Sequence, residues 1–291
     1  MEMTAHRTPP IFRTLLILGR SSNLPTVWSN CMAGWLLAGG GGGGRLFWLL
    51  VGASLLYTGG MFLNDAFDVD FDRQHRRQRP IPSGAISERE VWAYGFSQLG
   101  LGAIILVQLG SVTSTLTVLL VGCILLYDAI HKLVAISPLL MAACRFLLYL
   151  VAASVSAQGV AGLAVWSALA MGTYIVGLSY LARKETSRGP LNNWPCYLLA
   201  VPLLLAFIVN YGTSHRMPLV ILFLAAAWIL WSLRHIFWKP QRNIGFTVSL
   251  LLAGIPLVDW LAVGGGGFLI GAVFVLLFFS ALLLQRFIPA T

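Results

Sequence analysis

The sequence has few charged residues and lacks any cysteine spacing typical of a metal site. Only 10% of its 291 residues are Asp, Glu, Lys or Arg, and 58% are hydrophobic. A soluble domain needs more polar surface than this, so the composition favours a polytopic membrane protein. Four cysteines lie far apart in apolar runs, which favours buried packing over zinc binding. They are Cys31, Cys123, Cys144 and Cys196.

A cleavable signal peptide of the usual kind is also missing. The apolar stretch after the basic N-terminal residues is interrupted by Asn23, Pro25 and Asn30, and no small-residue cleavage site stands out. We therefore expect the first apolar segment to be retained. The net charge of +9 does not indicate nucleic acid as a partner, because the basic residues stand at the ends of apolar segments.

Ten apolar stretches approach the length of about 20 residues that crosses a bilayer. Lipid offers no hydrogen bonds to a backbone, so the stretches are expected to be helices. The sequence predicts one all-α transmembrane domain over 1–291, with a cytoplasmic segment at 1–20 and a duplicated four-helix unit as an option. The stretches are 22–38, 46–63, 91–109, 113–130, 135–155, 163–182, 194–212, 217–236, 243–262 and 267–286.

The 19 Lys and Arg residues are distributed unequally if these stretches alternate in direction. One side receives only Arg45 and Arg216, and Arg145 falls inside a span. The other sixteen share one side, which the positive-inside rule assigns to the cytoplasm together with both termini. These are Arg7, Arg13, Arg20, Arg73, Arg76, Arg77, Arg79, Arg89, Lys132, Arg183, Lys184, Arg188, Arg234, Lys239, Arg242 and Arg286.

An acidic segment, NDAFDVDFD, follows the second stretch. On a helix of about 100° per residue, Asp65, Asp68 and Asp72 share one stripe, Asn64 lies near Asp68, and Asp70 points elsewhere. Neighbouring carboxylates repel one another unless a cation lies between them. Oxygen ligands suit Mg²⁺, which shares its coordination shell with substrate phosphates. We interpret Asp65, Asp68 and Asp72 as metal ligands.

Basic residues follow this acidic segment at once. Arg76, Arg77 and Arg79 are placed to contact the oxygens of the same phosphates. The alternative is a solvated loop or a stop-transfer signal. Topology needs no aspartates at a membrane boundary, since acidic residues contribute little to it. The pattern therefore favours a phosphate site.

The pattern N-D-x-x-D-x-x-x-D followed by R-P-I-P-S-G resembles the first Asp-rich motif of the UbiA superfamily of intramembrane prenyltransferases. The resemblance covers nearly the whole chain. It extends to Arg20, Asn23 and Pro25 at the first span and to Tyr127 and Lys132 at the end of the fourth. The stretch GRSSNLPTVWSN is similar to the EboC-like branch. The resemblance implies a bundle of nine to ten transmembrane helices around a central lipophilic cavity.

The resemblance also implies an activity, a cofactor and partners. The expected reaction is Mg²⁺-dependent transfer of a prenyl group from an isoprenyl diphosphate to an aromatic or other lipophilic acceptor within a bilayer, the bacterial inner membrane. The motif loops would face the cytoplasm. Six residues are assigned to catalysis: Asp65, Asp68, Asp72, Lys132, Lys184 and Glu185. Nine are assigned to diphosphate binding: Arg20, Asn23, Asn64, Arg76, Arg77, Arg79, Tyr127, Arg183 and Arg188.

The second Asp-rich motif of the family is absent. Its place after the sixth span reads YLARKETSRGP, in which Glu185 is the sole carboxylate. Glu185 can hold a second ion weakly, the cations can contact the diphosphate directly, or catalysis has been lost. Arg183, Lys184 and Arg188 can also be plain topology signals.

Four ionisable groups lie in or beside the spans, and three of them have two interpretations. Lys132 can touch the diphosphate or extend toward the membrane surface from a helix end. Asp128 and Arg145 are costly in a membrane and often functional. We expect them to pair with each other and leave both out of the site. Asp259 is expected to be interfacial.

Two other functions compete with prenyl transfer. The first is a non-catalytic protein that binds or transports a prenyl lipid or metabolite in a UbiA-like chamber. The missing second motif favours it, and the absence of the helix breaks of many transporters opposes it. The second is a divalent-cation permease, which would not need arginines beside its aspartates.

Overall fold

Helices make up the computed structural model, which describes residues 10–183, 193–210, 217–238, 242–264 and 266–290 and has no strand among them. Their bounds are α1 Ile11–Leu18, η1 Ser21–Asn23, α2 Leu24–Leu37, α3 Gly43–Phe67, α4 Val69–His75, α5 Glu88–Val107, α6 Ser111–Ile130, α7 Ser137–Val155, α8 Gly162–Arg183, α9 Trp194–Leu198, α10 Val201–Asn210, α11 Met217–Phe237, α12 Ile244–Ala253, α13 Ile255–Val263 and α14 Phe268–Leu284.

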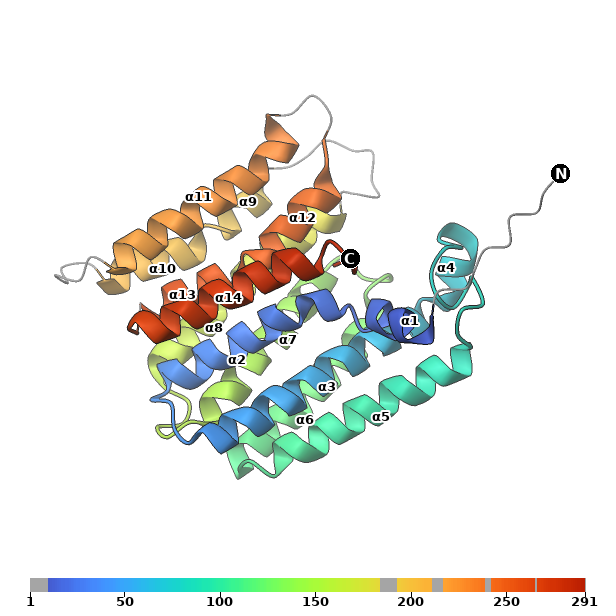
Figure 1. Cartoon of the computed structure of the whole chain (residues 1–291), viewed down its shortest axis with the longest axis horizontal. Coiled ribbons are helices and arrows are strands. Elements are labelled where there is room, and N and C mark those ends of the chain that lie inside the picture. The colour runs from blue at the N-terminus through green and yellow to red at the C-terminus, as the bar shows by residue number, and fades with distance from the viewer. Residues whose placement is uncertain (1–9, 184–192, 211–216, 239–241, 265, 291) are drawn as a thin grey trace.

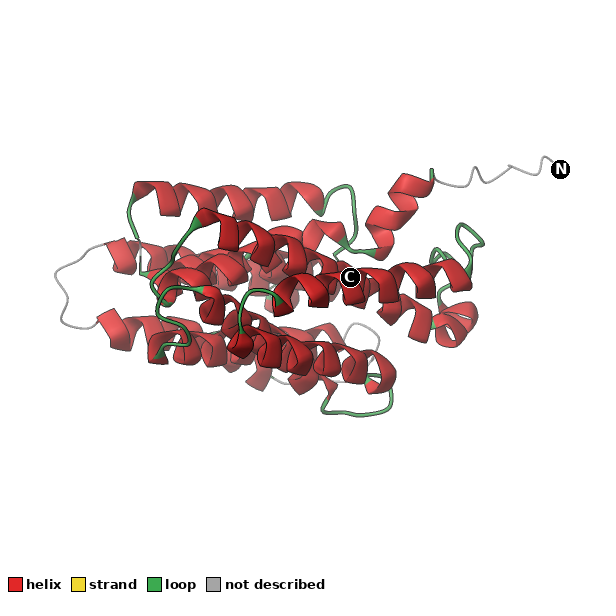
Figure 2. Ribbon diagram, turned by 90° about the horizontal axis from the view of Figure 1, so that it is seen from below, coloured by secondary structure: helices red, strands yellow, loops and turns green. Residues whose placement is uncertain are grey.

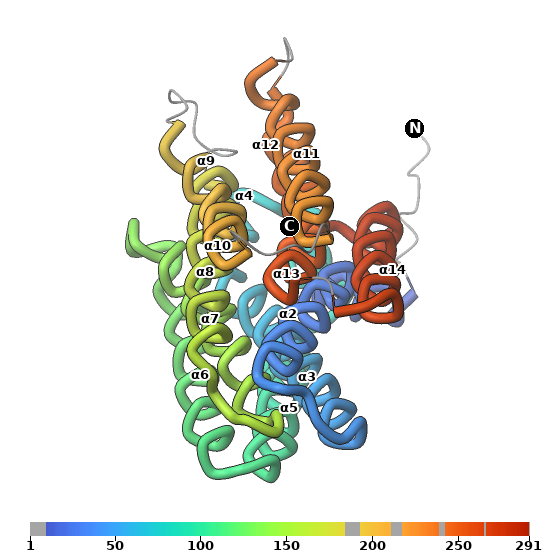
Figure 3. Tube along the Cα trace, turned by 90° about the vertical axis from the view of Figure 1, so that its left-hand side faces the viewer, coloured from blue at the N-terminus to red at the C-terminus, as the bar shows by residue number. Residues whose placement is uncertain are grey.

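The long helices lie roughly parallel to one another (Figures 1 and 2). Figure 3 shows α5 and α6 at one edge of the bundle and α11 and α12 at the opposite edge. Between them, α7 packs against α2, α6 and α8, and α2 also contacts α13 and α14. The connection from α3 to α5, which carries α4, lies at one end of the bundle (Figure 1).

The prediction of an all-helical polytopic membrane protein is confirmed. Among the described residues, seven helical segments are long and apolar enough to cross a membrane: α3, α5, α6, α7, α8, α11 and the continuous stretch Ile244–Val263. The other three predicted stretches are helical but shorter. Trp194–Asn210 and Phe268–Leu284 are apolar, and α2 has 14 residues. The count of nine to ten spans stays a prediction.

Helices α3 and α5 pack closely because glycines face each other across their contact. A Cβ atom on Gly102 of α5 would lie 2.8 Å from the carbonyl oxygen of Gly52 and 2.9 Å from the backbone nitrogen of Leu56, both on α3. Backbone atoms cannot move aside as a side chain can. Small residues at such contacts let membrane helices approach closely, where packing rather than hydrophobicity drives association.

Replacing Gly102 with alanine should therefore destabilise the bundle. We expect a cost of about 1–3 kcal/mol, typical of an overpacked contact, and a lower midpoint of thermal unfolding in detergent. Gly100→Ala is the matched control, because a Cβ on Gly100, two residues earlier on α5, would meet no atom within 4 Å. Equal midpoints for the two variants would contradict this account of the contact.

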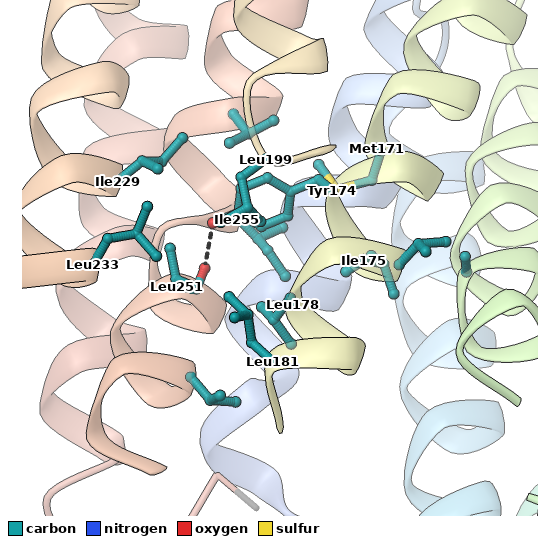
Figure 4. Packing of buried hydrophobic residues seen from close by; sticks show 14 residues of the cluster. Met171, Tyr174, Ile175, Leu178, Leu181, Leu199, Ile229, Leu233, Leu251 and Ile255 are labelled. Atoms are coloured by element: carbon teal, nitrogen blue, oxygen red, sulfur yellow. Dashed lines mark hydrogen bonds between the residues drawn. The ribbon is translucent and has the colours of Figure 1, made fainter. Parts of the chain in front are cut away.

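A buried hydrophobic cluster joins α8, α11 and α12 and includes Tyr174, Leu178, Leu233 and Leu251 (Figure 4). The fully buried Tyr174 hydroxyl donates a hydrogen bond of 2.8 Å to the backbone oxygen of Leu251. This oxygen lies in the last turn of α12 and also accepts from the backbone N–H of Gly254 at 3.2 Å. The hydroxyl therefore links α8 to the junction of α12 and α13.

The loop that follows α4 is held in place at both ends. Ile81 and Ile86 are buried against α1, α3 and α5. At the start of α5, Ser87 and Glu90 form a capping box, in which each side chain bonds to the backbone N–H of the other residue. The Arg-rich segment thus has a fixed position relative to the end of α3.

Candidate functional site

A chamber of about 680 Å³ opens inside the bundle. Its lining comes mainly from α3, α6, α7 and α8, and α2 and α12 add a few residues. Much of the wall is apolar, and its polar groups gather where α3, α6 and α8 end and α7 begins. The apolar lining includes Val27, Ala53, Leu56, Leu120, Ile124, Leu148, Ile175, Leu178, Val248 and Leu252.

The aspartates lie where the chain bends at the end of α3. Asp68 lines the mouth of the chamber, whereas Asp65 and Asp72 are buried and do not line it. Asp65, Asp68 and Asp72 are 4%, 8% and 3% exposed, whereas the side chain of Asp70 is 88% exposed. The predicted continuous helix through these residues is wrong, because α3 ends at Phe67 and α4 begins at Val69. Three carboxylates are nevertheless turned inward and the fourth faces outward.

Two arginines hold Asp65 from different parts of the chain. Arg20 Nη2 lies 3.3 Å from Asp65 Oδ1 and 3.2 Å from Asn64 Oδ1, and Arg79 Nη1 lies 3.5 Å from the same Asp65 oxygen. Among the described residues, Arg20 is the one non-glycine residue with positive φ, at 42°. This conformation is costly for such a residue and is found where the surroundings enforce it. It turns the Arg20 side chain toward the end of α3.

Lys132 and His131, which follow α6, meet Asp68. Lys132 Nζ lies 2.7 Å and His131 Nε2 lies 3.5 Å from Asp68 Oδ1, and Lys132 Nζ is 3.8 Å from the ring centroid of Phe71. Lys132 therefore lines the chamber and contacts Asp68. Burial disfavours ionised Asp68, but the bonds from His131 and Lys132 outweigh it, so the pKa of Asp68 lies below its ordinary value. At Asp72 burial dominates and raises the pKa.

Asp128 and His131 are not among the predicted site residues. Both line the chamber, and Asn64 Nδ2 donates a hydrogen bond of 3.1 Å to Asp128 Oδ1. A signal was present: Asp128, His131 and Lys132 are spaced i, i+3 and i+4, which puts them on one helix face. The spacing shows a shared face, but only the fold shows that this face meets the end of α3.

The remaining predicted residues divide into three groups. Asn23, Arg76, Tyr127 and Arg183 line the chamber together with Arg20, Asn64, Asp68, Arg79 and Lys132. Arg77 is exposed and does not line it, because the turn after α4, closed by Arg79 N–H to Arg76 O, directs Arg77 outward. Lys184, Glu185 and Arg188 lie outside the described residues.

The predicted pair of Asp128 and Arg145 is wrong. Asp128 bonds to Asn64, whereas Arg145 donates to Thr26 and Asn30 on α2. The prediction of an interfacial Asp259 is also wrong, since this residue is fully buried. Sequence position gives the depth of a residue in a span but not the rotation of its helix, and rotation decides the partner.

The donor set fits Mg²⁺ shared with a phosphate. No group of three His, Cys, Asp or Glu side chains in the described ranges is close enough to hold a metal alone. However, Asp65 Oδ2 and Asp72 Oδ1 are buried and have no hydrogen-bond partner within that part of the chain. Such orphaned oxygens call for an ion or water. Mg²⁺ ordinarily takes one or two carboxylates, waters and substrate phosphates.

Fold and site together define an integral membrane protein with an acidic, cation-lined mouth on an apolar chamber. Residues 24–246 match the model of the UbiA prenyltransferase family, and the chain belongs to this family. The assignment to the EboC-like branch stays a prediction.

Two curated relatives carry activities in their names. The chain is 34% identical over 126 residues to 4-hydroxybenzoate octaprenyltransferase of Paracidovorax citrulli, which covers 40% of each chain. It is 29% identical over 105 residues to digeranylgeranylglyceryl phosphate synthase of Sulfolobus acidocaldarius, which covers 36% of this chain and 38% of the relative. The matches thus span about two fifths of these relatives.

Solved structures share the fold over nearly their whole length. A UbiA homologue from Aeropyrum pernix K1 gives a TM-score of 0.65 at 17% identity, covering 92% of this chain and 98% of that one. A UbiA homologue from Archaeoglobus fulgidus, bound to GPP and Mg²⁺, gives a TM-score of 0.52 at 14% identity. The match covers 94% of this chain and 99% of that one.

Proposed function

We propose that the protein transfers a prenyl group from an isoprenyl diphosphate to a lipophilic acceptor within the membrane, with Mg²⁺ as cofactor. The observation that carries this proposal is the pairing of two environments in one cavity. Buried carboxylates and cations gather at the mouth, and the chamber of about 680 Å³ behind it is largely apolar. A diphosphate suits the first environment and an isoprenoid tail the second.

The cations at the mouth have a defined task in this reaction. Arg20, Arg79 and Lys132 would donate hydrogen bonds to the diphosphate oxygens, and these bonds strengthen as negative charge develops on the leaving group. One or two of the carboxylates of Asp65, Asp68 and Asp72 would hold the metal together with diphosphate oxygens and water. When bound, Mg²⁺ supplies positive charge that stabilises the departing diphosphate.

The chamber wall has a second task, the exclusion of water. Loss of diphosphate from an allylic prenyl group leaves a carbocation that water would quench. Leu56, Leu120 and Leu148 line the chamber and are no more than 7% exposed. An apolar wall of this kind keeps water away from the carbocation, so the prenyl group can reach the acceptor.

The experiment is to incubate the purified protein with Mg²⁺, radiolabelled prenyl diphosphates and a lipid extract of the host. Label that moves into a lipid product supports an enzyme. Bound prenyl diphosphate without any transfer would favour the alternative, a non-catalytic prenyl-lipid or metabolite carrier. Absence of binding would contradict both readings.

We also infer that the mouth faces the cytoplasm, since most basic residues lie at that end. With the four native cysteines removed, a cysteine at exposed Ser83 should resist a membrane-impermeant thiol reagent in intact cells. A cysteine at exposed Gly43, at the start of α3 and thus the other end, should react readily. The reverse pattern would place the site on the outer face.

A further inference from the structure

Two cysteine thiols meet in the wall of the chamber. Cys144 Sγ of α7 lies 3.6 Å from Cys123 Sγ of α6, and Cys123 Sγ lies 3.5 Å from the backbone oxygen of Leu140. Both cysteines are free and partly buried. The proposed transfer of a prenyl group uses neither of them. Sequence spacing does not reveal the pair, because the two residues are 21 positions apart and lie in different apolar runs.

The two thiols lie at the same depth because α6 and α7 are consecutive helices that pack against each other. Cys123 stands seven residues before Ile130, the last residue of α6, and Cys144 stands seven residues after Ser137, the first residue of α7. At 1.5 Å per residue, both lie about 10 Å from the mouth ends of their helices. This depth is within the membrane-spanning part of each helix.

One of the two thiols is accessible from the chamber. Cys144 is part of the chamber lining. Cys123 is not, although Leu120 and Ile124 on the same helix are. The wall around them is apolar, so an uncharged, lipid-soluble molecule inside the chamber can approach Cys144 without losing water-exposed polar contacts. Cys123 is then the partner that Cys144 contacts on its other side.

Charge decides which chemistry the pair supports. A metal ion would need both sulfurs as thiolates, and charged groups inside a membrane span are costly. No third His, Cys, Asp or Glu side chain in the described ranges is close enough to complete a metal site. A disulfide is uncharged, as are the two thiols from which it forms. It joins sulfurs about 2 Å apart, so each sulfur has to move by less than ~1 Å from the contact of 3.6 Å.

We propose that Cys123 and Cys144 form an oxidisable dithiol, a modification site at which a lipid-soluble quinone produces a reversible disulfide. A quinone is uncharged and accepts both electrons and protons, so no charge is left in the membrane. The two S–H bonds break and one S–S bond forms. Two electrons and two protons pass to the quinone, which leaves as the quinol. A thiol reductant reverses the change by thiol–disulfide exchange. The proposal does not depend on prenyl transfer.

The disulfide would tie α6 to α7 across the connection that carries His131 and Lys132. Both of these residues contact Asp68 at the chamber mouth. A cross-link of this kind stabilises a folded protein mainly because it restricts the unfolded chain. The oxidised protein should therefore resist unfolding more strongly than the reduced one, with His131 and Lys132 enclosed in a covalent loop.

The test is to reconstitute the purified protein in phosphatidylcholine vesicles and to add duroquinone, whose fully substituted ring does not add thiols. Mass spectrometry of unreduced peptides should detect a link between Cys123 and Cys144, which dithiothreitol removes. The midpoint of thermal unfolding should rise by about 5 °C on oxidation. Cys196→Ser is the matched control and should keep both effects, because Cys196 lies on α9, away from the pair.

Cys123→Ser and Cys144→Ser should each abolish the link and the rise in midpoint. Without quinone, both variants should unfold near the midpoint of reduced wild type, which reports that they are folded. Absence of the link in wild type, or a link that joins Cys31 or Cys196 instead, would overturn the proposal. A rise in midpoint that persists in Cys144→Ser would overturn it as well, since the quinone would then act elsewhere.

Discussion

Asp68→Asn should weaken the binding of geranyl diphosphate in Mg²⁺ by at least about tenfold, or ~1.4 kcal/mol. The Asp68 carboxylate lies 2.7 Å from Lys132 and is turned inward at the chamber mouth. Asparagine has nearly the same shape, so packing is retained. It lacks the charge that would hold the metal and orient Lys132. Equilibrium binding of the labelled diphosphate, with Mg²⁺ and with EDTA, measures the effect.

Asp70→Asn is the control for this substitution. Asp70 is two residues away and its side chain is 88% exposed, where it contacts Arg73. Exposed ion pairs contribute little to stability. The affinity of the Asp70→Asn variant for geranyl diphosphate should therefore match that of wild type. If Asp68→Asn also matched wild type in both Mg²⁺ and EDTA, the assignment of the aspartates to the diphosphate site would be wrong.

Lys132→Gln should lower the rate of prenyl transfer by about a hundredfold, as loss of one donor to a developing anion commonly does. Its effect on diphosphate affinity should be smaller, because contacts that strengthen in the transition state raise turnover more than binding. Initial rates of transfer are measured with the fraction of the lipid extract that the wild-type protein labels. Affinity is measured separately with geranyl diphosphate alone. The rate reports catalysis and the affinity reports binding.

Arg77→Gln provides the matched control. Arg77 is close in sequence to the motif, and its substitution removes the same charge as Lys132→Gln. However, Arg77 is exposed and does not line the chamber. Its rate should stay within about twofold of wild type, since surface charges have small effects. A similar loss in both variants would mean that net positive charge near the mouth matters, and not the contact between Lys132 and Asp68.

The ion pairs at the mouth also bear on the cation-permease hypothesis. Asp65 is met by Arg20 and Arg79, and Asp68 by Lys132. A free divalent cation approaching these carboxylates would be repelled by three neighbouring positive charges. A diphosphate carries negative charge of its own and would be attracted by them. The arrangement therefore favours an anionic ligand that brings the metal with it.

Much of the fold follows from the sequence for a simple physical reason. A helix is the structure that satisfies its own backbone in lipid, so each of the ten apolar stretches predicts a helix, and each forms helical structure where described. The length of each helix follows less directly from the sequence, because α2 has only 14 residues and α9 is separate from α10. Such shortening depends on tertiary packing, which hydropathy does not contain.

The site was only partly predictable. The spacing of Asp65, Asp68 and Asp72 is local, so helix geometry anticipates that they turn inward and Asp70 outward. The partners of Asp128 and Arg145 come from other helices. Their identity depends on how each helix is rotated about its axis, which the sequence does not reveal without the fold. The same limit applies to Asp259, whose partners lie on α2.

Binding of geranyl diphosphate to the purified wild-type protein tests the central claim most directly, because it needs no knowledge of the acceptor. The account predicts saturable binding at one site in Mg²⁺ that EDTA abolishes and that returns when Mg²⁺ is restored. Absence of binding, or binding of equal strength in Mg²⁺ and EDTA, would contradict a metal-dependent diphosphate site at the mouth of the chamber.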